Sequence, residues 1–192
     1  MNAHEDLSRE KKRIRRELLG IRNGFTDEYI RRCGKELADC IAGSTFYKEA
    51  EAVLLYASYG SELSTDMLME RCLDDGKTLF LPKVSGKDMD FFRVSSLSML
   101  VPDGYRGIRE PESSTEKFIY PEADKNAIMV MPAVGLSEDG YRLGYGGGFY
   151  DRYLGKYSGL SEYTVAVCYR ELLLPVVPHD EFDVRPARCI VI

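Results

Sequence analysis

Apolar and polar residues follow one another along the chain in blocks that favour helices and strands in alternation. Helical spacing of apolar positions predicts an amphipathic helix over 4–22, and these positions are Leu7, Ile14, Leu18 and Ile21. Thr26 is a typical N-cap and is followed by two acidic residues, so a second helix is expected to run to about Ile41 and to stop at Gly43.

Apolar segments bounded by turn residues predict the strands: 51–59, 78–84, 89–94, 127–133, 163–169 and 189–192. The continuous runs AVLLYA and AIMVMPA suit strands that are covered on both faces of a parallel sheet. The 89–94 segment alternates and is expected to form an antiparallel hairpin with the strand before it. Further helices are predicted up to about Asp74, with Ser64 or Thr65 as the N-cap, and over 147–157, with a short helical turn over 171–174.

This order of elements predicts an α/β fold: a three-layer α/β/α open sheet, mostly parallel, in one domain over 1–192. The signal is weak from Ser95 to Asp124, where turn-rich sequence such as Pro102-Asp103-Gly104 predicts a long irregular connection. Connections of that length inside a compact domain are often functional.

Composition narrows the class of protein. The net charge of -5 argues against nucleic acid as the main partner. No apolar run approaches the ~20 residues of a membrane span, and the charged N-terminus is unlike a signal peptide, so we expect a cytoplasmic protein without a membrane partner. The 5 cysteines are an odd number without a CxxC pair and there are only 2 histidines, so buried free thiols are expected, not a disulfide framework or a zinc site.

A glycine-rich stretch over 131–154 carries the clearest chemical signal, and it reads MPAVGLSEDGYRLGYGGGFYDRYL. Its glycines allow backbone N–H groups to turn onto a ligand, and a helix expected to open near Gly148 adds its positive dipole end, so phosphate is the expected guest. The stretch lacks the Lys-Ser/Thr pair of a Walker A loop, and Phe149 stands where a dinucleotide fingerprint needs a small residue. Any cation must therefore come from elsewhere.

Carboxylates near this stretch are candidates for a metal site. Asp151 would repel a phosphate unless a cation lies between them, and Mg²⁺ held by one or two carboxylates plus phosphate oxygens is the common solution. Asp180, in the segment PHDEFD, is a second candidate, although an Asp in such a turn also suits ordinary turn chemistry. Acidic residues also favour helix N-termini, which is the plainer interpretation of Asp151.

Other candidate residues have two interpretations each. Lys11 and Arg15 lie four residues apart on one face of a strongly basic helix, where they suit either an anion or a solvated surface. The βαβ spacing puts Glu62 and Lys83 at the carboxyl ends of neighbouring strands, where open α/β sheets bind ligands. Aromatic spacing predicts packing for Phe149, Tyr150 and Tyr153, whereas Tyr145 suits stacking on a flat base or pterin-like ring.

The stretch over 131–154 resembles the signature of the 5-formyltetrahydrofolate cyclo-ligase family. The resemblance extends over essentially the whole chain, through KKRIRREL, LYASYGSELST, LFLPKV and the acidic segment near 180. It implies an ATP-dependent cyclisation of 5-formyltetrahydrofolate to 5,10-methenyltetrahydrofolate, with Mg²⁺ required and with ADP and phosphate released. In that family the formyl oxygen is phosphorylated, N10 closes the ring and phosphate leaves.

The resemblance also implies roles for residues of this chain. Arg142 and Tyr150 correspond to catalytic positions, and Asp151 with Asp180, or Asp183 if the late segment shifts, corresponds to magnesium ligands. The positions that correspond to ATP contacts are Lys11, Arg15, Arg142, Leu143, Gly144, Tyr145, Gly146, Gly147, Gly148, Phe149 and Tyr150. The positions that correspond to folate contacts are Ala57, Glu62, Tyr145, Gly146, Gly147, Gly148 and Phe149. A monomer or weak homodimer is expected.

Two other functions fit the sequence. A sugar-phosphate isomerase or a coenzyme A transferase of similar architecture would share the fold without needing ATP as a phosphoryl donor. The basic segment between Arg9 and Arg16 would alternatively serve as an arm for nucleic acid or an acidic protein, with binding that falls steeply as salt rises.

Overall fold

A twisted, mostly parallel sheet forms the centre of the molecule. The computed structural model describes residues 3–101, 104–112, 115–120 and 126–192. The strands lie in the order β3-β2-β1-β4-β7-β9, and only the β2–β3 pair is antiparallel. Their bounds are β1 Ala52–Leu54, β2 Thr78–Ser85, β3 Asp88–Val94, β4 Ala127–Pro132, β7 Thr164–Cys168 and β9 Arg188–Val191. The predicted α/β class and the β2–β3 hairpin are confirmed.

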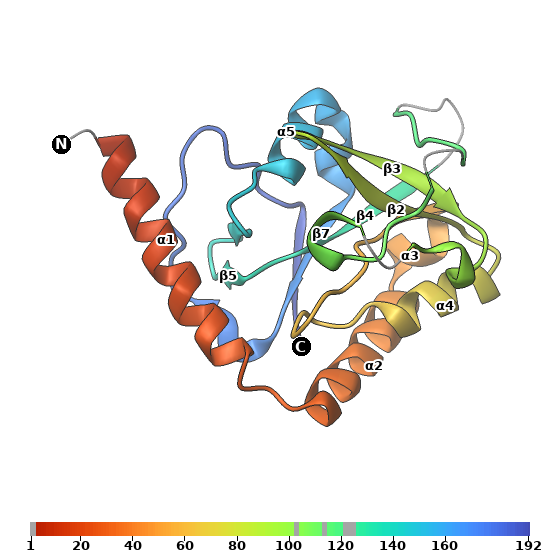
Figure 1. Ribbon diagram of the computed structural model, residues 1–192, viewed down its shortest axis with the longest axis horizontal. Helices are drawn as coiled ribbons and strands as arrows, with labels where there is room; N and C mark the ends of the chain where they lie inside the picture. Colours follow the sequence, from red (N-terminus) through yellow and green to blue (C-terminus); the bar gives the residue numbers. More distant parts are fainter. Residues whose placement is uncertain (1–2, 102–103, 113–114, 121–125) are drawn as a thin grey trace.

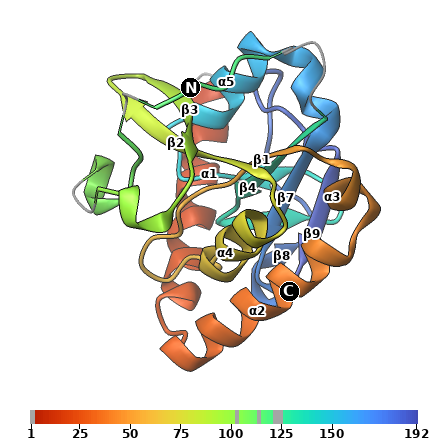
Figure 2. The same ribbon diagram turned by 90° about the vertical axis from the view of Figure 1, so that its right-hand side faces the viewer.

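The chain winds outwards from β1 and β4 in opposite directions. From β1 it passes through α4 (Asp66–Asp74) to β2, and from β4 it passes through α5 (Phe149–Lys156) to β7. Right-handed crossovers in opposite directions place their helices on opposite faces of a sheet. Figures 1 and 2 agree with this, because both views place α5 above the sheet and α4 below it, where α4 packs on α2 (Asp27–Gly43). The switch point between β1 and β4 is where such sheets bind ligands.

The helices before the sheet begin and end close to the predicted positions. Helix α1 spans Ala3–Arg22 and lies beside the sheet, apart from the other helices (Figure 1). Thr26 caps α2 through a hydrogen bond that its side chain accepts from the backbone N–H of Tyr29, as predicted. The short helix α3 (Thr45–Glu49) follows directly.

Several local predictions need correction. Ile21 was expected on the apolar face of α1, but 48% of it is exposed, and Arg22 is buried instead with 5% exposed. Thr65 occupies the N-cap of α4 without capping it, because its hydroxyl donates to the carbonyl of Tyr56 at 2.6 Å. The helical turn expected over 171–174 is a 3-10 turn, η4 (Arg170–Leu172), followed by strand β8 (Leu173–Leu174).

A second sheet, which the sequence did not predict, lies beside the first. It has the order β6-β5-β8, with β5 at Gly135–Ser137 and β6 at Arg142–Leu143. Strands of two or three residues leave almost no periodic signal in the sequence. They can be recognised only from their pairing with strands that are distant in sequence. The β5–β6 hairpin carries the glycine-rich stretch out of the central sheet.

The connection after β3 is irregular, as predicted. Its described parts hold the 3-10 turns η1 (Leu97–Met99) and η2 (Tyr105–Gly107), together with a bridge between Val101 and Glu110. The predicted turn at Pro102-Asp103 lies outside the described residues. A 3-10 turn η3 (Ser158–Tyr163) joins α5 to β7.

The core lies between the sheet and its helices and includes three of the cysteines. Cys33, Cys72 and Cys168 are buried free thiols, whereas Cys40 and Cys189 are exposed, so the prediction of buried thiols is wrong for these two. Cys40 lies on the solvent side of α2, where helical period takes it away from the buried face. Among the described residues, no helix combines the length and apolar character that crossing a bilayer requires.

Candidate active site

Two cavities meet at the glycine-rich loop. The charged cavity, of about 310 Å³, is lined by Leu7, Ser8, Lys11, Arg15, Pro132, Arg142, Leu143, Gly144, Tyr145, Gly146, Gly147, Gly148, Phe149, Tyr150, Asp151, Asp180 and Asp183. The apolar cavity, also of about 310 Å³, is lined by Tyr56, Ala57, Tyr59, Glu62, Pro82, Val84, Met89, Tyr105, Ile108, Glu110, Pro132, Tyr145, Gly146, Gly147, Phe149 and Tyr150. The shared residues make the loop a common wall between the two.

The sheet explains this position. Ala57 follows β1, Pro82 lies in the carboxyl half of β2 and Pro132 ends β4. The apolar cavity therefore opens towards the carboxyl ends of neighbouring strands at the switch point. Every predicted ATP-contacting residue lines the charged cavity, as do both predicted metal ligands. Every predicted folate-contacting residue lines the apolar cavity except Gly148, which lines only the charged one.

The loop depends on glycine at two positions in particular. Gly146 and Gly148 have φ of +92° and +65°, a region that side chains with a Cβ rarely adopt. A Cβ at Gly146 would also approach the Arg15 guanidinium carbon to 3.2 Å. Gly148 is the N-cap of α5, so the loop delivers the amino end of that helix to the charged cavity.

Helix α1 supplies the cations that the loop lacks. Arg15 donates a hydrogen bond from Nε to the carbonyl of Gly144 at 2.7 Å, and Lys11 forms an ion pair with Asp183. Burial lowers the pKa of the Arg15 guanidinium, and the negative charge of Asp183 opposes that shift. Two cations from the first helix therefore lie beside a backbone loop suited to an anion.

Arg142 and Asp151 form a pair within the same cavity. Nη2 of Arg142 donates to Oδ1 of Asp151 at 3.0 Å, and the backbone N–H of Val184 donates to the same oxygen at 3.3 Å. The Arg142 side chain is only 5% exposed. Its buried Nε has no hydrogen-bond partner within the described part of the chain. A buried guanidinium with an unused donor fits an anionic ligand, because leaving that donor unpaired is costly.

The donor set of the charged cavity also fits a magnesium ion that arrives with phosphate. Asp151, Asp180 and Asp183 all line it. Over the described ranges, no cluster of three or more Asp, Glu, His or Cys side chains could hold a metal by itself. Mg²⁺ takes one or two carboxylates and completes its octahedron with water and phosphate oxygens, so this arrangement suits a shared site better than a protein cage.

Glu62 is the charged group of the apolar cavity. It is only 8% exposed, and its Oε2 accepts a hydrogen bond from the backbone N–H of Tyr59 at 2.8 Å. Burial raises the pKa of Glu62, while hydrogen bonds from Tyr145 and Tyr59 and the positive charge of Arg22 hold it down. A buried carboxylate among aromatic side chains can pair with the N–H groups of a flat heterocycle.

The aromatic residues after the loop divide between packing and the cavities. Tyr153 is buried against Phe91, with ring centroids 5.1 Å apart, as its spacing predicts. Phe149 and Tyr150 also pack against the core, as predicted, but they line both cavities as well, which helical spacing does not reveal. Burial, with the charge of Glu62, raises the pKa of Tyr150, so its hydroxyl stays protonated and can donate a hydrogen bond.

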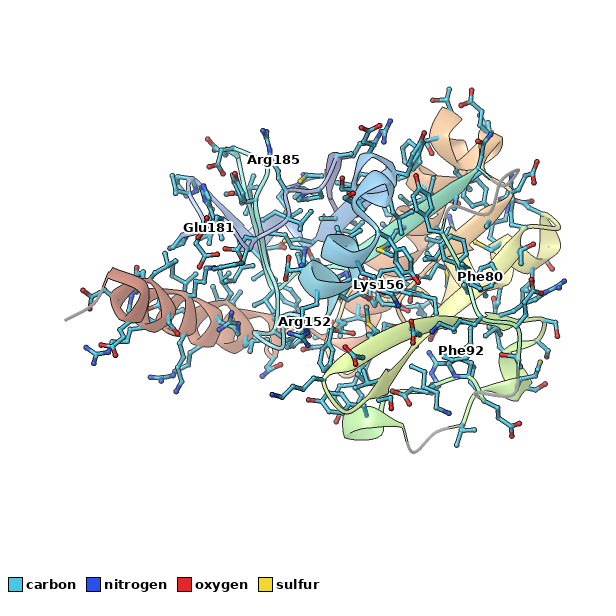
Figure 3. The ribbon with its side chains drawn as sticks, turned by 90° about the horizontal axis from the view of Figure 1, so that it is seen from above. Phe80, Phe92, Arg152, Lys156, Glu181 and Arg185 are labelled. Carbon is cyan, nitrogen blue, oxygen red and sulfur yellow. The ribbon has the colours of Figure 1, made fainter. Side chains whose placement is uncertain are left out.

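Lys83 does not join the site. Strand alternation turns it away from the face that Pro82 and Val84 present to the apolar cavity, and its ammonium donates to the carbonyl of Pro111 at 3.1 Å. Sequence reasoning missed two arginines near the site. One is Arg22, which lies beside Glu62 and Tyr145. The other is Arg152, which is labelled in Figure 3. Its side chain donates hydrogen bonds to the loop carbonyl of Gly147 at 2.8 Å and to the carbonyl of Lys87, in the β2–β3 turn, at 2.6 Å.

Comparisons with known proteins agree with the resemblance seen in the sequence. A sequence model of the 5-formyltetrahydrofolate cyclo-ligase family matches residues 7–191. A probable 5-formyltetrahydrofolate cyclo-ligase of Caenorhabditis elegans is 27% identical over 193 residues, covering 96% of this chain and 92% of the relative. The 5-formyltetrahydrofolate cyclo-ligase of Escherichia coli K12 is 27% identical over 166 residues, covering 85% of this chain and 90% of the relative.

Solved structures are similar too. The 5,10-methenyltetrahydrofolate synthetase of Aquifex aeolicus superposes with a TM-score of 0.79 at 29% identity, covering 94% of this chain and 89% of that structure. The synthetase of Mycoplasma pneumoniae superposes with a TM-score of 0.71 at 21% identity, covering 94% and 97%, which supports the fold.

Proposed function

Because the chain belongs to the 5-formyltetrahydrofolate cyclo-ligase family, we propose that it cyclises 5-formyltetrahydrofolate to 5,10-methenyltetrahydrofolate, with ATP as phosphoryl donor. The observation that carries this proposal is the shared wall: one glycine-rich loop separates a cavity rich in cations from an apolar cavity with a buried carboxylate. Such a pair of cavities suits a reaction that joins a phosphate group to a flat, largely apolar substrate.

The charged cavity is proposed to hold the triphosphate. Lys11, Arg15 and Arg142 would offset the charge that develops on the transferring phosphoryl group, and loop N–H groups at the start of α5 would orient it. The Lys11–Asp183 and Arg142–Asp151 pairs would then exchange carboxylate partners for phosphate oxygens and a metal.

Asp151 with Asp180 or Asp183 is proposed to hold magnesium beside the phosphates. When bound, the ion would neutralise phosphate charge and orient the terminal phosphoryl group. These carboxylates lie on α5 and on the segment before β9, so both elements must keep their places for the site to form.

The apolar cavity is proposed to hold the reduced folate. Glu62 would accept hydrogen bonds from the N–H groups at the edge of the pterin, next to Ala57 in the segment after β1. Tyr145, Phe149 and Tyr150 belong to both cavities, so they would lie between the two substrates. The formyl oxygen would thereby face the terminal phosphate.

The need for ATP follows from the leaving group in the ring closure. Hydroxide is a poor leaving group, so direct ring closure by N10 would not expel the formyl oxygen. Attack of that oxygen on the terminal phosphorus breaks the bond to the bridging oxygen of ADP and makes a phosphate ester. N10 then attacks the formyl carbon, the carbon–oxygen bond breaks with loss of phosphate, and N10 gives up its proton to water. The protonated hydroxyl of Tyr150 would donate to the oxygen that leaves.

A direct assay tests the proposal. Purified protein mixed with 5-formyltetrahydrofolate and MgATP should produce the absorbing methenyl product together with equimolar phosphate. Omitting ATP should abolish both, which separates a ligase from an isomerase or a coenzyme A transferase of similar fold. Product formation without ATP, or none with it, would refute the proposal.

The oligomeric state and location of the protein are proposed as well. We expect a monomer or weak homodimer in the cytoplasm, acting on small molecules only. Sedimentation at micromolar concentration would test the oligomeric state, and fractionation of cells would test the cytoplasmic location.

A further inference from the structure

Arg22 is a buried cation that the roles above leave unexplained. It ends α1, it is 5% exposed, and its Nε donates to the hydroxyl of Ser61 at 3.1 Å. Burying a guanidinium is costly unless charged and polar partners compensate for lost water. Ser61 is a neutral partner, so other neighbours of Arg22 must also compensate for the water that its guanidinium loses on burial. These neighbours lie towards the glycine-rich loop.

Those neighbours belong to the apolar cavity. The guanidinium carbon of Arg22 lies 5.2 Å from the centroid of the Tyr145 ring, which is within range of a cation–π contact. Its positive charge also acts on the carboxylate of Glu62, which lines the apolar cavity together with Tyr145. Arg22 therefore lies behind two residues of the cavity wall without lining either cavity itself.

Helix geometry links this contact to the phosphate side. At 100° per residue, Arg15 and Arg22 stand only about 40° and about 20° around α1 from Lys11, so all three share one stripe. The rise of 1.5 Å per residue puts Arg22 about 10 Å beyond Arg15 along the axis. Helix α1 (Figure 1) thus carries Lys11 and Arg15 at the charged cavity and, at its end, Arg22 beside the wall of the apolar cavity.

Ser61 and Glu62 are themselves held in place. The hydroxyl of Tyr169 donates to the carbonyl of Glu62 at 3.1 Å, and the Ser61 hydroxyl donates to the side-chain oxygen of Asn23 at 2.8 Å. The segment that carries Glu62 is therefore tied to the central sheet and to the end of α1 together. A shift of α1 would therefore displace the segment that carries Glu62.

We propose that Arg22 is a positioning residue for the folate cavity, because its buried guanidinium joins the end of α1 to Ser61 and to the Tyr145 ring, beside the Glu62 carboxylate. Its positive charge favours the ionised form of the nearby carboxylate, and its contact with Tyr145 links the helix proposed to bind phosphate to the wall proposed to bind folate. The inference rests on the proposed function, since it assigns Glu62 to the reduced folate.

Arg22→Gln tests the role. The variant should raise the KM for 5-formyltetrahydrofolate, and its Kd in equilibrium dialysis without ATP, by about tenfold, the loss of one charge-assisted contact. The KM for ATP should change less than about threefold. Arg22→Lys keeps the charge and should recover part of the loss. Arg16→Gln, at an exposed position on the same helix, is the matched control.

A double variant separates this role from a merely structural one. If Arg22 acts through the charge of Glu62, then Arg22→Gln added to Glu62→Gln should weaken folate binding by less than about threefold further. Fully additive effects, or equal losses for ATP and folate, would overturn the inference. Should Arg22→Gln fail to fold by circular dichroism, Arg22→Lys enters the same comparison in both backgrounds.

Folate binding and product formation together distinguish failure of the proposed function from failure of the role proposed for Arg22. A wild-type protein that neither binds 5-formyltetrahydrofolate in dialysis nor forms product would refute the proposed function together with this inference. A wild-type protein that does both, with an Arg22→Gln variant that folds and binds folate equally well, would refute this inference alone.

Discussion

Arg15 donates a hydrogen bond to the backbone carbonyl of Gly144 at 2.7 Å, across 129 residues of sequence. This contact fixes the first helix to the glycine-rich loop. It also places a cation beside a loop that has backbone donors but no lysine of its own after the glycines. The proposed phosphate site is therefore assembled from two distant parts of the chain, and the first predictions concern each part.

The cations of α1 should contribute to nucleotide binding. Lys11→Ala or Arg15→Ala should raise the KM for ATP or lower kcat by at least about tenfold, the scale of one lost charged contact. Steady-state kinetics with varied ATP would measure this. The neighbouring exposed residues offer matched controls, Lys12→Ala and Arg16→Ala, which should change neither parameter more than about twofold. Equal effects at both pairs of positions would point to general surface charge.

The loop should not tolerate a side chain at Gly146. Gly146→Ala places a Cβ at a φ of +92° and 3.2 Å from the Arg15 guanidinium carbon, so the loop must rearrange. We expect higher KM values for both substrates, because Gly146 lines both cavities. Gly155→Ala, in helix α5 with no heavy atom within 4 Å of its added Cβ, should keep activity and stabilise the protein by up to about 1 kcal/mol. Unchanged kinetics in Gly146→Ala would count against a rigid loop.

The three aspartates should differ in their effect on metal dependence. Asp151→Asn should raise the Mg²⁺ concentration needed for half-maximal activity by at least about tenfold, because an amide is a weaker magnesium ligand than a carboxylate. The same titration on Asp180→Asn and Asp183→Asn identifies the second ligand as whichever gives the larger shift. Asp88→Asn, exposed on the β2–β3 hairpin, serves as control. A normal Mg²⁺ titration in all three variants would refute the metal site.

Glu62 should lower stability at neutral pH. Burial raises its pKa above the ordinary value near 4.5. A raised folded-state pKa favours folding below the unfolded pKa, and this contribution is lost as pH rises through the folded pKa. Glu62→Gln removes the titration, so its Tm relative to wild type should increase from about pH 5 to about pH 8 by calorimetry. A difference that is constant or falls with pH would show that the carboxylate is well compensated.

Docking of α1 should depend on a close approach to β5. A Cβ at Gly135 would lie 2.5 Å from Cδ1 of Leu18, so Gly135→Ala should displace the helix. We expect a KM for ATP raised at least about threefold, together with a loss of 1–3 kcal/mol, roughly the cost of overpacking, in urea unfolding. Gly20→Ala, on α1 itself with open space around its added Cβ, should leave ATP kinetics intact. Normal ATP kinetics in Gly135→Ala would show that α1 tolerates a shift.

Much of the fold could be predicted from local pattern. The extent of α1, the Thr26 cap and the continuous apolar run of β4 each depend on neighbours a few residues away, and each was found where expected. The glycines of the loop could also be recognised from local sequence, since their spacing indicates an unusual backbone conformation. Resemblance of motifs then identified Lys11, Arg15 and Glu62, all of which line the cavities.

What the sequence determined by itself was the set of elements, their order and the family. Only the tertiary structure decided which face of each element met which partner. It buried Arg22 and exposed Ile21, paired β5 with β8, and turned Lys83 away from the site. The physical reason is that period and propensity are properties of neighbouring residues, whereas burial and charge pairing arise between elements far apart in sequence. The Arg15–Gly144 contact is of this second kind.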